Sequence, residues 1–229
     1  MANFVGRIGK EMVATALALS ILVACSPSAS VSTVPKKSPM GMDAFGHTRM
    51  SEERTTLSAD ERGHAERLIV HLRTTLAKYR TAAAAERDGY LPAGEDVPVG
   101  QLKHFANDAD VGLAKNWFVP DRPMAILYRR TPTGFELAGA MFNAPIAAFM
   151  DELDRRAPLA LGHWHAHRNI CVPKRGRAPL TKAERHAFGF SGSIATRSAC
   201  DAAGGFFMDN VYGWMMHVYP FEPTLAAQF

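Results

Sequence analysis

The sequence predicts a single α+β domain, in which helices pack outside an antiparallel sheet of about five strands. Two observations predict this class. One long amphipathic helical pattern comes first, and the apolar runs that follow it are short and strand-like. Two of these runs are joined by the turn sequence Thr-Pro-Thr-Gly at 131–134, which is typical of a β-hairpin. The domain is expected to span residues 58–229, after a signal peptide at 1–24 and a flexible tether at 25–57.

The first 24 residues have the layout of a secretory signal peptide. Arg7 and Lys10 precede an apolar run over residues 12–23, which is too short to span a bilayer comfortably. The run ends in Leu-Val-Ala-Cys, a sequence that resembles the bacterial lipobox. This resemblance implies cleavage before Cys25 and attachment of lipid, palmitate included, to its sulfur. The alternatives are an ordinary signal peptide and an uncleaved anchor.

The lipid on Cys25 would tether the chain to a membrane without a spanning helix, because each buried acyl methylene adds membrane affinity. Ser26 follows the cysteine. By similarity to the sorting rules of Gram-negative bacteria, this residue implies a position in the cell envelope, on the outer membrane and facing the periplasm.

The composition argues against nucleic acid as a partner. Loss of residues 1–24 leaves 205 of the 229 residues and removes two basic residues and one acidic residue. The formal net charge therefore falls from +4 to +3, and no block of like charge remains. The expected partner is the membrane itself, and the sequence does not identify a protein partner.

Residues 25–57 are expected to form a flexible tether, because Ser, Pro and other small residues dominate the first half and no period is visible. The tether contains Met40, Met42, His47 and Met50, whose thioether and imidazole groups are ligands that copper prefers. A linker that happens to contain methionine is the alternative.

A capping box marks the start of the first helix. Ser58 and Glu61 have the spacing at which each side chain satisfies a free backbone N–H of the other. An apolar stripe of helical spacing follows, made of Leu68, Leu72, Leu76 and Tyr79. An alanine run continues the pattern, and Gly89 is placed to end it.

The rest of the domain is expected to alternate between strands and short helices. The expected strands cover residues 101–107, 124–130, 135–142, 159–172 and 212–219. The expected helices cover residues 147–156 and 194–203, and a further one is capped by Thr181 and Glu184.

Two cysteines remain when Cys25 is set aside for lipid. An even pair in an oxidising compartment predicts a disulfide between Cys171 and Cys200. Such a bond would stabilise the fold by roughly 3–4 kcal/mol in the chain-entropy model. The alternatives are two buried free thiols and a pair of thiolate metal ligands.

The segment Gly-His-Trp-His-Ala-His-Arg-Asn-Ile-Cys is the most informative part of the chain. Alternate side chains of a strand share a face, so His163, His165 and His167 are expected together. Trp164 and Ala166 then point to the core. The outer two histidines of the three would be about 7 Å apart, so further ligands for one ion must come from neighbouring strands.

The sequence offers such ligands in two other expected strands. We expect a metal site made of His165, His167 and His217, with His104 as the fourth ligand or as a hydrogen-bond donor to one of them. Glu222 is an alternative ligand in place of one histidine. Neutral imidazole suits copper and zinc, so the expected cofactor is one of these ions. A solvated sheet face whose histidines hold no ion is the opposing interpretation.

Two segments carry a family resemblance. Trp-His-x-His-x-Asn-Ile-Cys at 164–171 and His-Val-Tyr-Pro-Phe-Glu at 217–222 are similar to sequences of an uncharacterised group of bacterial exported proteins. No activity comes with this resemblance, so it implies a recurring domain over roughly residues 60–222 and no functional residue.

The leading hypothesis is a cell-envelope lipoprotein that binds copper or zinc for storage, sensing or delivery. The first alternative is a metalloenzyme with an open coordination position. The second is a metal-free scaffold or interaction module. The sequence lacks the nucleophile elbow Gly-x-Ser-x-Gly, the phosphate-binding loop and the His-Glu-x-x-His zinc motif. None of these catalytic motifs therefore supports the enzyme hypothesis.

Overall fold

The computed structural model describes residues 32–33 and 46–229, apart from residues 95, 108–117, 175–180, 182, 183 and 185. The predicted signal peptide, the lipidation residue Cys25, and Met40 and Met42 lie outside the described residues. No helix in the described part is long and apolar enough to cross a membrane.

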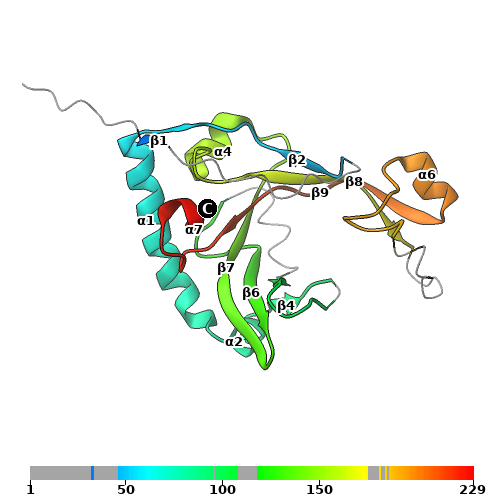
Figure 1. The fold of residues 1–229 in the computed structure, drawn as a ribbon, viewed down its shortest axis with the longest axis horizontal. Coiled ribbons are helices and arrows are strands. Elements are labelled where there is room, and N and C mark those ends of the chain that lie inside the picture. Colours follow the sequence, from blue (N-terminus) through cyan, green and yellow to red (C-terminus); the bar gives the residue numbers. More distant parts are fainter. Residues whose placement is uncertain are drawn as a thin grey trace, which may run out of the picture.

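The secondary structure consists of one long helix, several short ones and nine strands in the described ranges (Figure 1). The helices are α1 (Ala59–Leu76), the 3-10 helix η1 (Ala77–Tyr79), α2 (Ala82–Arg87), α4 (Met150–Arg156), α6 (Arg197–Ala202) and α7 (Leu225–Gln228). The strands are β1 (Ser32–Thr33), β2 (Thr48–Met50), β3 (Thr56–Leu57), β4 (Leu91–Pro92), β5 (Leu102–Ala106), β6 (Ala125–Thr131), β7 (Gly134–Ala144), β8 (His165–Pro173) and β9 (Gly205–Val218).

Seven of these strands form one antiparallel sheet in the order β2-β8-β9-β7-β6-β5-β4, while β1 and β3 pair with each other. The predicted α+β class with an antiparallel sheet is confirmed, and the prediction of about five strands is too low. The two additional strands, β2 and β4, have three and two residues. Strands this short carry too little alternation to be recognised in a sequence.

The fold begins earlier than residue 58, where the sequence analysis placed its start. β2 pairs with β8 at the edge of the sheet, and Leu57 on β3 belongs to the main core. His47 is fully buried, and its Nε2 lies 2.8 Å from the carbonyl oxygen of Gly192. Residues 47–57 of the expected tether are therefore part of the folded domain.

Two features of the sequence explain helix α1, its N-terminal capping box and its apolar stripe. Ser58 and Glu61 form the predicted capping box, in which the Ser58 N–H donates to the Glu61 carboxylate and the Glu61 N–H to the Ser58 hydroxyl. Leu68, Leu72 and Leu76 are buried against the sheet in the main core. Burial of each such leucine stabilises the fold by about 1.5–3 kcal/mol.

The sheet presents its two faces to different surroundings because side chains alternate along each strand. Phe105, Ile126, Phe142, Trp164 and Trp214 point into the main core with α1. The opposite face carries a smaller apolar cluster, which is made of Met124, Ala125, Leu127, Met141 and Met215. The four candidate histidines belong to this second face.

Strands β8 and β9 extend beyond the rest of the sheet as a two-stranded arm with α6 at its far end (Figure 1). The arm ends in its own apolar cluster, where the predicted disulfide between Cys171 and Cys200 is confirmed. The two cysteines have a Cα–Cα distance of 5.6 Å and no exposed surface. This bond attaches α6 to β8.

Two strand boundaries differ from the sequence prediction. Residues 159–164 are not part of β8, because Leu161 and Gly162 donate backbone hydrogen bonds to Pro158 and close a turn there. β9 begins at Gly205 rather than at 212. Tyr212 and Gly213 both have positive φ (61° and 78°), and this irregularity interrupts the alternation by which a long strand is recognised.

Candidate functional site

The four candidate histidines come from three strands of the sheet and share its second face. His104 lies on β5, His165 and His167 on β8, and His217 on β9. The predicted separation of side chains on β8 holds for the two strand histidines, since Trp164 and Ala166 lie in the main core. His163 precedes β8, is half-buried, and does not line the cavity described below.

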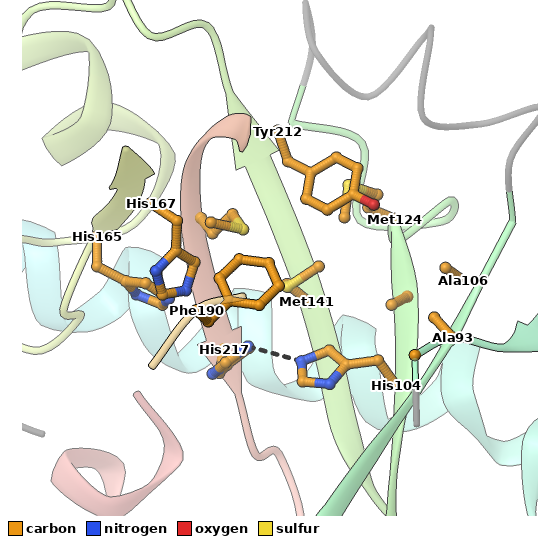
Figure 2. A pocket seen from close by; sticks show the side chains of 13 residues that line it. Ala93, His104, Ala106, Met124, Met141, His165, His167, Phe190, Tyr212 and His217 are labelled. Atoms are coloured by element: carbon orange, nitrogen blue, oxygen red, sulfur yellow. Dashed lines mark hydrogen bonds between the residues drawn. The ribbon is translucent and has the colours of Figure 1, made fainter. Parts of the chain in front are cut away.

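His104 and His217 meet although two strands separate them in the sheet. The order β9-β7-β6-β5 would place them roughly 14 Å apart in a flat sheet, at about 4.8 Å per strand. Their Nε2 atoms are nevertheless 3.1 Å apart (Figure 2). The two side chains therefore lean toward each other over the intervening strands, and the second face of the sheet is concave.

The remaining histidines extend this pair into a chain of contacting rings. The ring centroids are 5.2 Å apart for His104 and His217, 5.3 Å for His217 and His165, and 5.3 Å for His165 and His167. Figure 2 shows the rings of His165 and His167 side by side, with His217 between them and His104. We call these four residues the histidine cluster.

The histidine cluster lines a cavity of about 390 Å³. The other lining residues are apolar or aromatic with one exception, Gly94, and they are Ala93, Ala106, Met124, Ala125, Met141, Phe190, Tyr212 and Met215. None of the described lining residues carries a carboxylate or a thiol. The described cavity wall is therefore built from imidazoles, thioethers, hydrocarbon and the phenol of Tyr212.

Burial favours the neutral form of three of these imidazoles. Removal from water lowers the pKa of His104 and of His165, and it lowers the pKa of His217 well below the ordinary 6.5. Neighbouring histidines add a smaller effect in the same direction at His104 and His217, because each disfavours positive charge on the other. A neutral imidazole has the free lone pair that a metal ion requires.

Phe190 and β2 flank the cluster on the β8 side. The ring of Phe190 meets that of His167 edge-on, with 4.8 Å between centroids. Thr48 on β2 pairs with His167, and its Oγ1 lies 3.5 Å from the His167 Nδ1. His167 is thus held between the edge strand and an aromatic side chain that is itself 48% exposed.

The four histidines meet some of the geometric requirements of a metal site and not others. Two nitrogen ligands of a tetrahedral ion at 2.0–2.1 Å are about 3.3 Å apart, and the 3.1 Å between His104 and His217 is close to this distance. The same distance is that of a hydrogen bond between the two rings. Within the described ranges, no three His, Cys, Asp or Glu side chains converge as a group on one point that could hold an ion. Binding by three or more histidines therefore requires rotation of their rings.

One residue that the sequence offered as a ligand lies outside the site, and several residues of the site were not predicted. Glu222, the alternative ligand, is exposed, follows β9 and does not line the cavity. The methionines of the cavity were not predicted. One indication was present in the sequence, because Met215 stands two positions before His217 and must share its face of the strand.

Comparisons of the chain with protein families, with curated proteins and with solved structures found no match.

Proposed function

We propose that this chain is a cell-envelope lipoprotein that binds a transition-metal ion, copper or zinc, through the histidine cluster. One observation carries the proposal: imidazoles from three separate strands line one cavity, and two of them bring their Nε2 atoms to 3.1 Å. A solvated sheet face would leave its histidines in water, whereas the relative exposed surface of His165 is only 5%.

The removal of these imidazoles from water, nearly complete for His165 and partial for the other three, needs a compensating interaction, because a polar group that leaves water without a full set of partners costs free energy. The contact between His104 and His217 offsets part of this cost, and a bound ion would offset more. The lowered pKa values of His104, His165 and His217 favour the same proposal, since they favour the deprotonated imidazole that binds a metal ion.

The test is the metal content of the full chain, purified in detergent without a histidine tag and measured by elemental analysis. The test variant replaces His104 and His217 with Ala, and a second replaces His165 and His167. The matched control replaces two other histidines, His64 and His71, which lie on α1 outside the cavity.

We expect about one metal ion per chain in the unmodified protein and in the control, and loss of the ion in both cluster variants. Circular dichroism spectra must show that the variants are folded. Metal retained at full occupancy in a folded cluster variant, or the absence of copper and zinc binding in the unmodified protein, would refute the proposal.

The lipid anchor requires its own test. Replacement of Cys25 with Ser should abolish incorporation of labelled palmitate and release the protein from the outer-membrane fraction. Palmitate incorporation that persists in this variant would exclude Cys25 as the lipidated residue.

A metalloenzyme is the second candidate, and the size of the cavity favours it. A volume of about 390 Å³ exceeds what an ion requires and leaves room for a small substrate beside it. Azide added to the cobalt-loaded protein distinguishes the two candidates. A change in the visible spectrum indicates an open coordination position, and an unchanged spectrum indicates a closed binding site.

A further inference from the structure

The methionines of the cavity are interleaved with its histidines. Met141 on β7 is the direct cross-strand partner of His217, and Met215 on β9 is that of His165. Directly opposed residues of antiparallel strands have Cβ atoms about 4.5–5.5 Å apart on the same face. Each of these two histidines therefore has a thioether beside it, within the same buried layer.

Both methionines face the cavity from buried positions. Met141 is 5% exposed and Met215 is 3% exposed, and both line the cavity together with Met124 (Figure 2 labels Met124 and Met141). On the other side of His165, Met50 of β2 is its cross-strand partner. The strand register thus puts a methionine beside the histidine cluster on β2, β7 and β9; those on β7 and β9 line the cavity, and Met50 on β2 is exposed outside it.

A site that combines thioethers with imidazoles selects among metal ions by their chemical softness. Thioethers bind soft ions such as monovalent copper, and imidazole also binds copper, whereas zinc sites are built from imidazole, thiolate and carboxylate. The described lining residues supply the first combination and lack the thiolates and carboxylates of the second.

The charge of the ion also favours a monovalent ion over a divalent one. The cost of transferring an ion from water into an apolar cavity grows with the square of its charge. A divalent ion therefore gains more from anionic ligands than a monovalent ion does, and the described part of the wall has no anionic side chain. A monovalent ion carries a quarter of the penalty and can be held by uncharged imidazoles and thioethers.

We infer that the cavity binds monovalent copper, with His104, His217 and Met141 as one ligand group and His165 and Met215 as the adjacent one. This inference rests on the proposed function, which it narrows from copper or zinc to one ion and one oxidation state. Monovalent copper also accepts fewer ligands than the tetrahedral four of zinc, so a pair of histidines with one thioether is sufficient.

The competing interpretation is that these methionines only fill space. They pack against Ala125 and Leu127 in the small apolar cluster, and methionine is a common filler of irregular gaps. Leucine has a similar volume and no sulfur, so exchange of Met for Leu separates the two roles. A merely structural methionine tolerates the exchange, and a ligand does not.

The experiment titrates the full chain in detergent with copper(I), without oxygen and with ascorbate, against a chromogenic copper(I) chelator. Cobalt(II) binding, followed by its visible spectrum, is measured on the same samples. The test variant carries Met141→Leu and Met215→Leu. The matched control is Met216→Leu, which alters a fully buried methionine of β9 that points to the opposite face.

We expect the double variant to lose about tenfold or more in copper(I) affinity. Its cobalt(II) binding and its thermal stability should stay close to those of the control. Unchanged copper(I) affinity in the folded double variant overturns the inference. If that variant nevertheless loses cobalt(II) or copper(I) when His104 and His217 are also replaced, the proposed metal site stands without thioether ligands. If the unmodified protein binds neither ion, both proposals fail.

Discussion

Replacement of Gly139 with Ala tests whether the close approach of β7 and β9 keeps His104 and His217 in contact. Gly139 on β7 lies against the end of β9. A β carbon at this position would overlap the carbonyl oxygen of Val218. It would also lie 3.0 Å from the Val218 carbonyl carbon and 3.1 Å from the Cα of Tyr219. All three are backbone atoms, so no side-chain rotation relieves the overlap.

The size of the displacement follows from these distances. Non-bonded carbons are at rest about 3.5–4.0 Å apart, so β9 must move away from β7 by at least about 0.5 Å. Val218 is the neighbour of His217, and His104 lies beyond β7 in the strand order. The separation of 3.1 Å between the two Nε2 atoms would therefore grow to about 3.6 Å, beyond a hydrogen bond.

Two measurements follow the substitution. Overpacking against rigid neighbours costs about 1–3 kcal/mol, which urea unfolding detects as a lower midpoint. The affinity for copper(I) should change with it, because β9 carries His217 and its displacement alters the position of His217 relative to His104. The matched control is Gly63→Ala in helix α1, where the added carbon meets only the flexible end of Arg67 at 3.2 Å.

The control should gain stability, since Ala is favoured over Gly in a helix interior by about 0.8–1.0 kcal/mol. The same chemical change thus has opposite signs at the two positions. A Gly139→Ala protein that unfolds at or above the urea midpoint of the unmodified protein, with unchanged copper(I) affinity, would refute the role given to the close approach of β7 and β9.

Three further predictions concern the disulfide, the pH dependence and the strained residue of β9. Replacement of Cys171 and Cys200 with Ala should cost about 3.6 kcal/mol in urea unfolding, because their sequence separation of 29 closes a loop of about 30 residues in the unfolded chain; an unchanged urea midpoint would contradict this. The free energy of unfolding of the metal-free protein should be full above pH 6.5 and fall as the pH is lowered through 6.5. The lowered pKa values of His104, His165 and His217 mean that the unfolded chain binds protons there more readily than the folded one, and each group adds at most about 1.4 kcal/mol per pH unit to the slope. A slope that stays the same when these three are replaced with Gln would exclude them as its source. Because the φ of Tyr212 is 61°, Tyr212→Gly should be more stable than Tyr212→Ala by about 1 kcal/mol in thermal unfolding, the reverse of the helix order; equal stabilities would mean that the backbone there is not strained.

Local patterns in the sequence were sufficient for several parts of the fold. The capping box at Ser58 and Glu61 involves groups three residues apart, so its two hydrogen bonds follow from the chain itself. The alternation that separates His165 and His167 from Trp164 has a period of two, which any extended strand imposes. The pairing of Cys171 with Cys200 followed from their number, once Cys25 was set aside for the predicted lipid.

Other features depend on how distant segments meet. β2 has three residues, too few for a period, and it is a strand only because β8 offers it an edge to pair with. The bulge at Tyr212 and Gly213 interrupts the alternation of β9, so the sequence predicted a strand that is too short. In the structure, β8 pairs with β9 on both sides of the bulge.

The candidate site also has some features that local sequence predicts and others that depend on the tertiary structure. The kinds of side chain, and the face of each strand that carries them, were determined by the sequence, because alternation acts over two residues. The order of the strands and the concavity that brings His104 to His217 were decided by the tertiary structure, as was the placement of Met141 opposite His217. The physical reason is range: strand register and order are chosen by burial of the whole apolar face against α1 and the rest of the main core, and no local pattern carries that information.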